Sequence, residues 1–232
     1  MSDLFNNENS LDALEAPLAD RMRPQSLDEV IGQNHLLGEE GPLQNMLTSG
    51  IFSSIILWGP PGVGKTTIAR LLADHSNSHF EQLSAIFTGV GDLKKVFEAA
   101  KFRRSNGHKT VVFVDEIHRF NKSQQDSFLP FLEDGTIILI GATTENPSFE
   151  LNPAILSRVQ VLVLERLNNT DLKKLLERAE GVLGSKINLD LDAKIELLKV
   201  ADGDGRALLN LIENIISWEI SNPITVKDLS VR

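Results

Sequence analysis

Residues 59–66 read Gly59-Pro60-Pro61-Gly62-Val63-Gly64-Lys65-Thr66, which matches the phosphate-loop (Walker A) pattern G-x-x-x-x-G-K-[ST]. The stretch follows the apolar run Ile55–Trp58 and begins the helical stretch Lys65–Asp74. Its glycines let the backbone curl so that several N–H groups point at one anion, and the helix N-terminus adds a positive dipole end. The alternative is a Gly/Pro-rich turn that binds nothing, but such a turn has no need of Lys-Thr at its end.

Two residues of this loop have a specific expected role toward a bound ATP. We expect Lys65 to reach the β- and γ-phosphates and the Thr66 hydroxyl to hold Mg²⁺. The predicted nucleotide-binding residues of this stretch are Gly59, Pro60, Pro61, Gly62, Val63, Gly64, Lys65, Thr66 and Thr67.

A second motif lies fifty residues after the lysine, where the apolar run Val111–Val114 ends in Asp115 and Glu116. Adjacent carboxylates repel each other, so this arrangement is unfavourable without a cation or a function. We expect Asp115 to complete the Mg²⁺ shell (Walker B) and Glu116 to polarise the attacking water as a general base. The alternative is an acidic turn exposed to solvent. With both motifs present, the sequence predicts hydrolysis of ATP rather than storage of a nucleotide.

Short apolar runs alternate with helical stretches between residues 53 and 164, which predicts the fold class. The runs are Ile55–Trp58, Val111–Val114, Ile137–Gly141 and Val159–Leu164, with a weaker one at His79–Ala85, and the helical stretches are Lys65–Asp74, Asp92–Arg104 and Ser123–Glu133. Strands that are apolar throughout are buried on both faces, and their alternation with helices predicts a parallel sheet covered on both sides. The predicted fold is therefore α/β, with ligands at the carboxyl ends of the strands.

The strand pattern stops after Arg166 and an all-helical pattern follows. We expect one helix capped by Asn169 or Thr170, a second at Leu191–Val200, and a third from Asp204 to about residue 220. The predicted parts are a mobile polar arm at residues 1–16, an α/β nucleotide-binding domain at residues 17–166 and a helical lid domain at residues 167–232.

Composition limits the partners and the compartment. The net charge of −9 does not favour DNA, so a nucleic-acid contact would need a local basic patch. The candidate patch consists of Lys101, Arg103, Arg104, His108 and Lys109. Its alternative interpretation is the cationic end of a helix. The chain has no cysteine, no apolar run long enough to cross a bilayer and no export signal, so we expect a cytoplasmic protein without a membrane partner.

Several segments resemble the RarA/MgsA family of replication-associated recombination ATPases, whose eukaryotic relative is the Werner helicase-interacting protein. They are Pro17-Leu18-Ala19-Asp20-Arg21-Met22-Arg23-Pro24, Val30-Ile31-Gly32-Gln33, Ile117-His118-Arg119-Phe120-Asn121-Lys122-Ser123-Gln124-Gln125-Asp126 and Gly141-Ala142-Thr143-Thr144-Glu145-Asn146-Pro147-Ser148-Phe149-Glu150-Leu151-Asn152. The resemblance runs from about Pro17 to the last helix, and clamp loaders and RuvB are its wider relatives. It implies an AAA+ module.

The resemblance also implies roles for five residues outside the two motifs. Ile31 and Gly32 resemble the segment that packs on adenine, and Thr144 resembles sensor 1, a polar group near the γ-phosphate. Arg158 resembles the arginine finger that reaches into a neighbouring subunit, and Arg206 resembles sensor 2. The alternatives are a turn cap for Thr144, an ordinary surface arginine at position 158 and a solvated helix entry at position 206.

The function that the resemblance implies is ATP hydrolysis to ADP and phosphate at stalled replication forks, in DNA repair and recombination. Single-stranded or forked DNA, replication proteins and further copies of the chain are the expected partners. The rivals are a clamp-loader subunit, a branch-migration motor and a nucleotide-binding interaction module with little turnover. The stretch from His118 to Gln125 is open to two interpretations: Lys122, Gln124 and Gln125 could approach DNA in a central channel or signal nucleotide state to a neighbour, or they could simply begin the helix Ser123–Glu133 with Ser123 as its N-cap. Family members continue into a helical oligomerisation domain, so we expect this chain to be a fragment or a short form.

Overall fold

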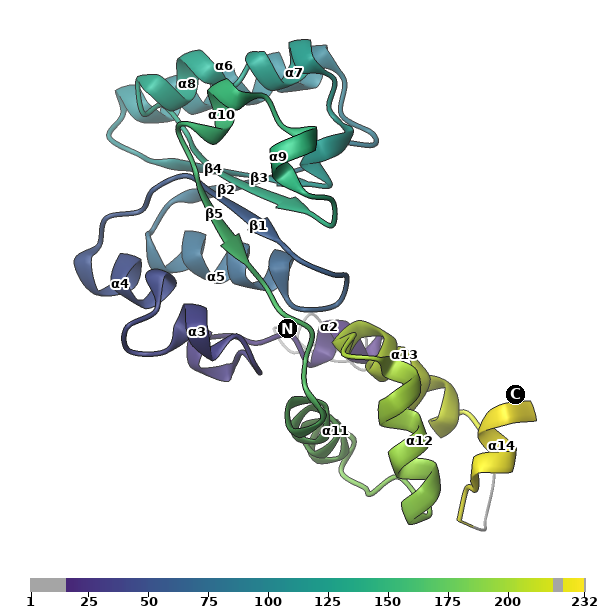
Figure 1. The fold of residues 1–232 in the computed structure, drawn as a ribbon. Helices are drawn as coiled ribbons and strands as arrows, with labels where there is room; N and C mark the ends of the chain where they lie inside the picture. The colour runs from purple at the N-terminus through teal and green to yellow at the C-terminus, as the bar shows by residue number, and fades with distance from the viewer. Residues whose placement is uncertain (1–15, 219–222, 232) are drawn as a thin grey trace, which may run out of the picture. The chain divides into compact units, whose positions relative to one another are not determined.

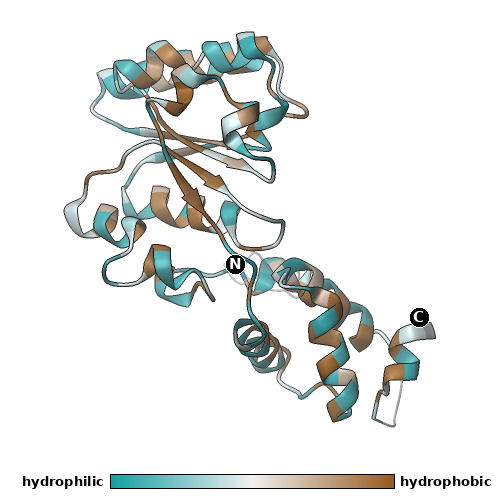
Figure 2. Cartoon of the chain, viewed as in Figure 1, coloured by the Kyte–Doolittle hydropathy of each residue, from teal (hydrophilic) through white to brown (hydrophobic). Residues whose placement is uncertain are grey.

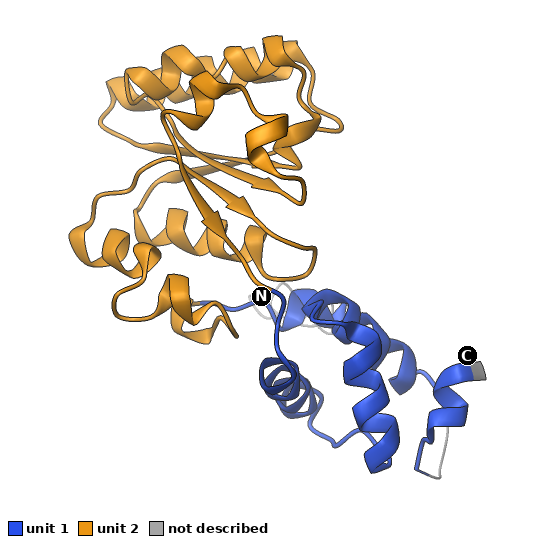
Figure 3. Cartoon of the chain, in the orientation of Figure 1, with its two compact units in different colours: residues 1–25, 166–232 blue, residues 26–165 orange. Residues whose placement is uncertain are grey.

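The computed structural model describes residues 16–218 and 223–231. The predicted mobile arm therefore lies, except for its last residue, outside the described residues. The chain forms two compact units, one made of Ser26–Glu165 and the other of the segments on either side of it (Figure 3). Each unit has apolar cores of its own.

The larger unit is built on a five-stranded parallel sheet with the strand order β2-β3-β4-β1-β5 (Figure 1). The strands are β1 Ile55–Trp58, β2 His79–Ser84, β3 Thr110–Asp115, β4 Ile138–Thr143 and β5 Gln160–Val163. Every predicted apolar run, including the weaker one, supplies one of these strands. The α/β fold with a parallel sheet is therefore confirmed, and the carboxyl ends of all five strands lie along one edge.

Helices cover both faces of the sheet, and its central strands β1, β3 and β4 are apolar and buried along almost their whole length (Figure 2). Ile55 and Leu57 pack in one core cluster with α5 (Lys65–His75), whereas Ile56 packs in a second cluster with α6 (Val90–Ser105). The other elements of this unit are η1 Leu27–Glu29, α3 Asn34–Leu37, α4 Pro42–Ser49, η2 Ile117–Arg119, α7 Lys122–Asp126, α8 Leu129–Glu133, α9 Pro147–Glu150 and α10 Pro153–Leu156.

The predicted single helix Ser123–Glu133 is wrong, because two short helices, α7 and α8, occupy this stretch. Pro130 stands in the first turn of α8. A proline there has no N–H to donate to the carbonyl four residues earlier, and its ring would clash with that carbonyl in a continuous helix. The cap also differs from the expectation, since Asn121 and not Ser123 caps α7.

The smaller unit is helical. Its elements are α2 Leu18–Arg21, α11 Asn169–Leu183, α12 Leu191–Ala201, α13 Gly205–Ile216 and α14 Val226–Val231. Asn168 caps α11, one residue before the first of the two predicted candidates, and its side chain accepts hydrogen bonds from the backbone N–H groups of Thr170 and Asp171. The helices pack leucine and isoleucine side chains around a common core. None of the described helices in either unit is long and apolar enough to cross a membrane.

The division of the chain differs from the predicted one at its N-terminal side. Leu18 and Met22 are buried in the core of the helical unit, and the backbone N–H of Leu18 donates to Glu213 at 3.0 Å. Residues 17–25 therefore belong with the helical unit rather than with the sheet. The segment is too short for its sequence pattern to indicate which unit it packs against. The second border falls between Glu165 and Arg166, next to the predicted one.

Candidate functional site

The glycine-rich loop curls between the end of β1 and the start of α5. Gly62 has a φ of 69° and Gly64 a φ of 94°, and Gly64 caps the helix that begins at Lys65. Such angles are in the left-handed region that side chains disfavour. Val63, between the two glycines, is buried in the core and anchors the loop.

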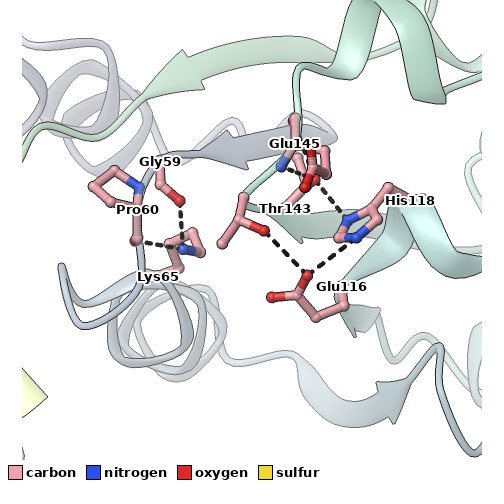
Figure 4. Close-up of polar contacts among 8 residues, drawn as sticks. Gly59, Pro60, Lys65, Glu116, His118, Thr143 and Glu145 are labelled. Carbon is pink, nitrogen blue, oxygen red and sulfur yellow. Dashed lines mark hydrogen bonds and ion pairs between the residues drawn. The ribbon is translucent and has the colours of Figure 1, made fainter.

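Lys65 lies inside the curl of this loop. Its Nζ donates to the backbone carbonyls of Gly59 and Pro60, both at 2.7 Å (Figure 4). The residue is 8% exposed, which is unusual for a lysine. The ammonium is therefore held on the concave side of the loop, where backbone N–H groups and a helix N-terminus favour an anion. Thr66 and Thr67 follow in the first turn of α5 and are half-buried.

The acidic pair lies at the end of β3. The four preceding residues of this strand, from Val111 to Val114, are buried, whereas Asp115 and Glu116 are half-buried. Glu116 has a φ of 53°. This angle is uncommon for a residue other than glycine and costs on the order of 1–2 kcal/mol. The chain is held in this conformation because the next residue, Ile117, is fully buried in the core.

The end of β4 joins the two motifs, because β4 lies between β1 and β3. The backbone N–H of Gly59 donates to the carbonyl of Thr143 at 3.1 Å. On the other side, the Thr144 hydroxyl donates to Oε2 of Glu116 at 3.4 Å, and the Thr143 hydroxyl lies 2.8 Å from Nδ1 of His118. The structure thus brings the phosphate loop, the acidic pair and Thr144 to one edge of the sheet.

Two members of this cluster were missed in the sequence. Thr143 is fully buried, and the His118 side chain, only 11% exposed, also reaches Glu116 with Nε2 at 3.3 Å from Oε2 (Figure 4). Their positions in the sequence could have indicated both residues, because Thr143 ends a central strand and His118 follows the acidic pair by two residues. The sequence left several interpretations open for the segment that begins at His118, so it predicted no contact for this side chain.

The segment with Ile31 and Gly32 lies beside the end of β5. Gln33 is buried, and its amide both donates to the carbonyl of Glu165 at 2.7 Å and accepts from the N–H of Glu165 at 3.0 Å. β5 pairs with β1, from which the phosphate loop emerges. The predicted adenine segment is therefore attached to the strand next to the phosphate loop.

The two predicted arginines lie in different surroundings. The Arg158 guanidinium donates to Oε1 of Glu133 at 2.5 Å and to the carbonyl of Ala154 at 2.7 Å, so its contacts are with α8 and α10. Arg206 is an exposed residue at the second position of α13, in the helical unit. The roles of both residues stay predictions.

Three of the five residues in the predicted basic patch contact acids or an aromatic ring of their own unit. Arg103 pairs with Glu81 at 2.7 Å, Arg104 pairs with Asp134 at 3.3 Å, and the Lys101 ammonium lies 5.1 Å from the Phe131 ring centre. Hydrogen bonding from Thr136, with help from the nearby cations, lowers the pKa of Asp134. These contacts favour the interpretation as the cationic end of helix α6 over a DNA-binding patch.

Comparison with known proteins agrees with this arrangement. The model of the ATPase family associated with various cellular activities (AAA) matches residues 55–167. Replication-associated recombination protein A of Coxiella burnetii is 49% identical over 209 residues, which cover 88% of this chain and 47% of that protein. The ATPase WRNIP1 of Dictyostelium discoideum is 45% identical over 205 residues, which cover 87% of this chain and 23% of that protein.

A solved structure of a motor protein has a similar fold. The Holliday junction branch migration motor RuvB of Thermotoga maritima has a TM-score of 0.69 and 28% identity, covering 83% of this chain and 64% of that chain. The present chain spans about half the length of the bacterial relatives it matches, 47% and 45% in two of them. With its parallel sheet, its phosphate loop and this level of identity, the chain belongs to the RarA/MgsA family of AAA+ ATPases.

Proposed function

We propose that this chain binds ATP with Mg²⁺ and hydrolyses it to ADP and phosphate, in the service of replication-associated recombination. The observation that carries the proposal is the contact chain from the phosphate loop to the acid. Gly59 bonds to Thr143, Thr143 bonds to His118, and both His118 and Thr144 bond to Glu116. A phosphate bound in the loop would therefore have a carboxylate close to the same edge of the sheet.

The residues present fit a magnesium ion. Thr66 and Asp115 offer a hydroxyl and a carboxylate, which are the hard oxygen ligands that Mg²⁺ prefers. No group of three or more His, Cys, Asp or Glu side chains suited to a metal occurs in the described residues. This agrees with Mg²⁺ held by one or two protein oxygens plus the phosphates of the substrate. When bound there, the ion would neutralise charge on the β- and γ-phosphates.

Each of the predicted site residues would have a separate role in binding or hydrolysing ATP. Lys65 would exchange its bonds to the loop carbonyls for bonds to phosphate oxygens, and Glu116 would orient the attacking water and accept its proton. Thr144 would hold Glu116 and stay near the γ-phosphate. Ile31 and Gly32 would pack against adenine. In this proposal the helical unit is the lid domain of the family and Arg206 its sensor residue.

DNA and further copies of the chain are the proposed partners. The names of the bacterial relatives refer to replication-associated recombination, and the structural relative is named a Holliday junction motor. Because the basic cluster near residue 103 is occupied by internal ion pairs, we place the DNA contact elsewhere, on the assembled oligomer. Branch migration is the second candidate, favoured by the likeness to RuvB.

Two substitutions test the enzymatic proposal. Lys65→Ala should abolish binding of a fluorescent ATP analogue, because the loop loses the cation at its centre. Glu116→Gln should keep binding but lower phosphate release by about 100-fold or more, the usual contribution of a general base. Unchanged turnover in the glutamine variant would remove Glu116 as the base.

The same assay separates the rivals. A wild-type chain that binds ATP tightly without releasing phosphate would be an interaction module instead of an enzyme. Turnover stimulated by forked or single-stranded DNA supports the fork proposal. Stimulation confined to four-way junctions, with strand exchange, supports the branch-migration motor.

A further inference from the structure

His118 is a nearly buried ring with both of its nitrogens engaged. It lies in the single turn η2 after Glu116, where Nδ1 is 2.8 Å from the Thr143 hydroxyl and Nε2 is 3.3 Å from Oε2 of Glu116 (Figure 4). The ring thus bridges the end of β4 and the carboxylate proposed as the base. A surface histidine that merely began a helix would need neither contact.

The protons in this cluster can be counted. The Thr143 hydroxyl has three neighbours: Nδ1 of His118, the N–H of Glu145 at 3.0 Å and the carbonyl of Glu145 at 3.2 Å. The N–H of Glu145 takes one oxygen lone pair. The single hydroxyl proton then goes either to the Glu145 carbonyl or to Nδ1 of His118.

One of these assignments places a proton on Nε2. If the hydroxyl donates to Nδ1, the ring carries its proton on Nε2, facing the carboxylate. If the hydroxyl donates to Glu145, Nδ1 carries the proton and donates to the hydroxyl. The first assignment directs the Nε2 proton toward Oε2 of Glu116, which lies 3.3 Å from Nε2.

The contacts to Glu116 converge on one oxygen. The Thr144 hydroxyl donates to Oε2, Nε2 of His118 lies 3.3 Å from the same oxygen, and within the described part of the chain no hydrogen bond engages Oε1. A glutamate side chain has several rotatable bonds, and two contacts on one oxygen restrict them. The free oxygen keeps a defined direction, as orientation of a water molecule requires.

We propose that His118 is a positioning residue for Glu116, oriented by Thr143 and acting through its Nε2 proton. The inference rests on the proposed ATPase function and deepens it. Because Thr143 also accepts from the N–H of Gly59, the position of the base is linked to the phosphate loop through one strand end. In this proposal His118 acts through Glu116 and not on the nucleotide, so its loss should change the rate of the reaction and not the binding of ATP.

Three substitutions at this position test the proposal in the whole chain. His118→Ala should lower kcat by about 10- to 100-fold, the effect expected when a reacting group loses its orientation, with KM for ATP changed less than about twofold. His118→Gln carries an amide N–H at about the place of Nε2 and should recover much of the rate. His118→Asn reaches only the place of Nδ1, so it should remain as slow as the alanine variant.

Two controls make the result specific. Arg119→Ala changes an exposed neighbour on the same turn and should leave kcat unchanged. In the Glu116→Gln background, His118→Ala should have no further effect, because the residue acts only through the carboxylate. Thermal unfolding of each variant shows whether a lost rate reflects a lost fold.

The outcomes separate this inference from the proposed function. A wild-type chain without ATP turnover would defeat the function itself. An active chain that depends on Glu116 but tolerates His118→Ala, or becomes faster with it, would overturn the positioning role alone. Equal rates for the glutamine and asparagine variants would also contradict it, since only the glutamine amide reaches the carboxylate.

Discussion

At the residue scale, Gly141 allows the turn that carries Glu116 to pack closely against β4. It lies in β4 and is buried. A Cβ added here would be 2.6 Å from Cδ1 of Ile56 and 3.0 Å from Cδ1 of Ile117. Both isoleucines are fully buried, so neither can move freely. The turn that carries Glu116 packs against β4 because position 141 is glycine.

Gly141→Ala should therefore lower the free energy of unfolding by about 1–3 kcal/mol, the usual cost of overpacking a core. It should also lower ATP turnover, because displacement of Ile117 moves Glu116. Urea unfolding and phosphate release measure the two effects. Gly91→Ala is the matched control: this helical glycine in α6 is exposed, has no atom within 4 Å of an added Cβ, and should tolerate alanine or gain stability. Equal stability of both variants would contradict the packing argument.

At the scale of elements, α7 depends on a cap that the sequence leaves ambiguous. The Asn121 side chain accepts from the N–H of Gln124 at 2.9 Å, and the Gln124 side chain accepts from the N–H of Asn121 at 3.1 Å. The adjacent Gln125 is buried and bonds to the backbone of Phe120, Glu150 and Asn152. The capped helix thus joins the segment after the acidic pair to the start of α10.

Asn121→Ala should destabilise the chain by about 1 kcal/mol, the typical cost of losing an N-cap. Ser123→Ala should change stability by less than about 0.5 kcal/mol, since this exposed residue lies inside the helix. Urea midpoints at equal slope compare the two variants. A larger loss for the serine variant would restore Ser123 as the cap.

At the scale of the whole molecule, the role proposed for Arg158 would link catalysis to the association of chains. Within one chain its guanidinium is paired with Glu133 and with the carbonyl of Ala154. An arginine that acts on a neighbour's nucleotide would have to leave these partners. Exposed ion pairs contribute little free energy, so the exchange is inexpensive.

Arg158→Ala should lower turnover by about 10³-fold or more under conditions in which chains associate, the range found for arginine fingers. It should have no effect on a strict monomer. ATPase rates across chain concentrations, with the particle mass measured in ATP and Mg²⁺, check this. Glu133→Gln is the companion variant and should leave the associated rate intact, because it only frees the arginine. An equal loss in monomers would exclude action on a neighbouring chain.

The sequence by itself determined the parallel sheet, the phosphate loop and the acidic pair. These features are local: a strand, a glycine-rich turn and a helix start are each encoded by neighbouring residues, and burial on both faces makes the strand runs apolar. The helix break at Pro130 could have been predicted from the sequence. The caps at Asn121 and Asn168 were harder to predict, because several adjacent polar residues could each cap the helix.

Only the tertiary structure decided which side chains meet. Thr143 and His118 come from different elements, as do Gln33 and Glu165, and each pair depends on strand order and register. Leu18 and Met22 joined the helical unit for the same reason, because their burial is provided by residues about 150 or more positions away in the chain. Contacts between distant segments are set by the packing of the whole core, and a local pattern does not encode them.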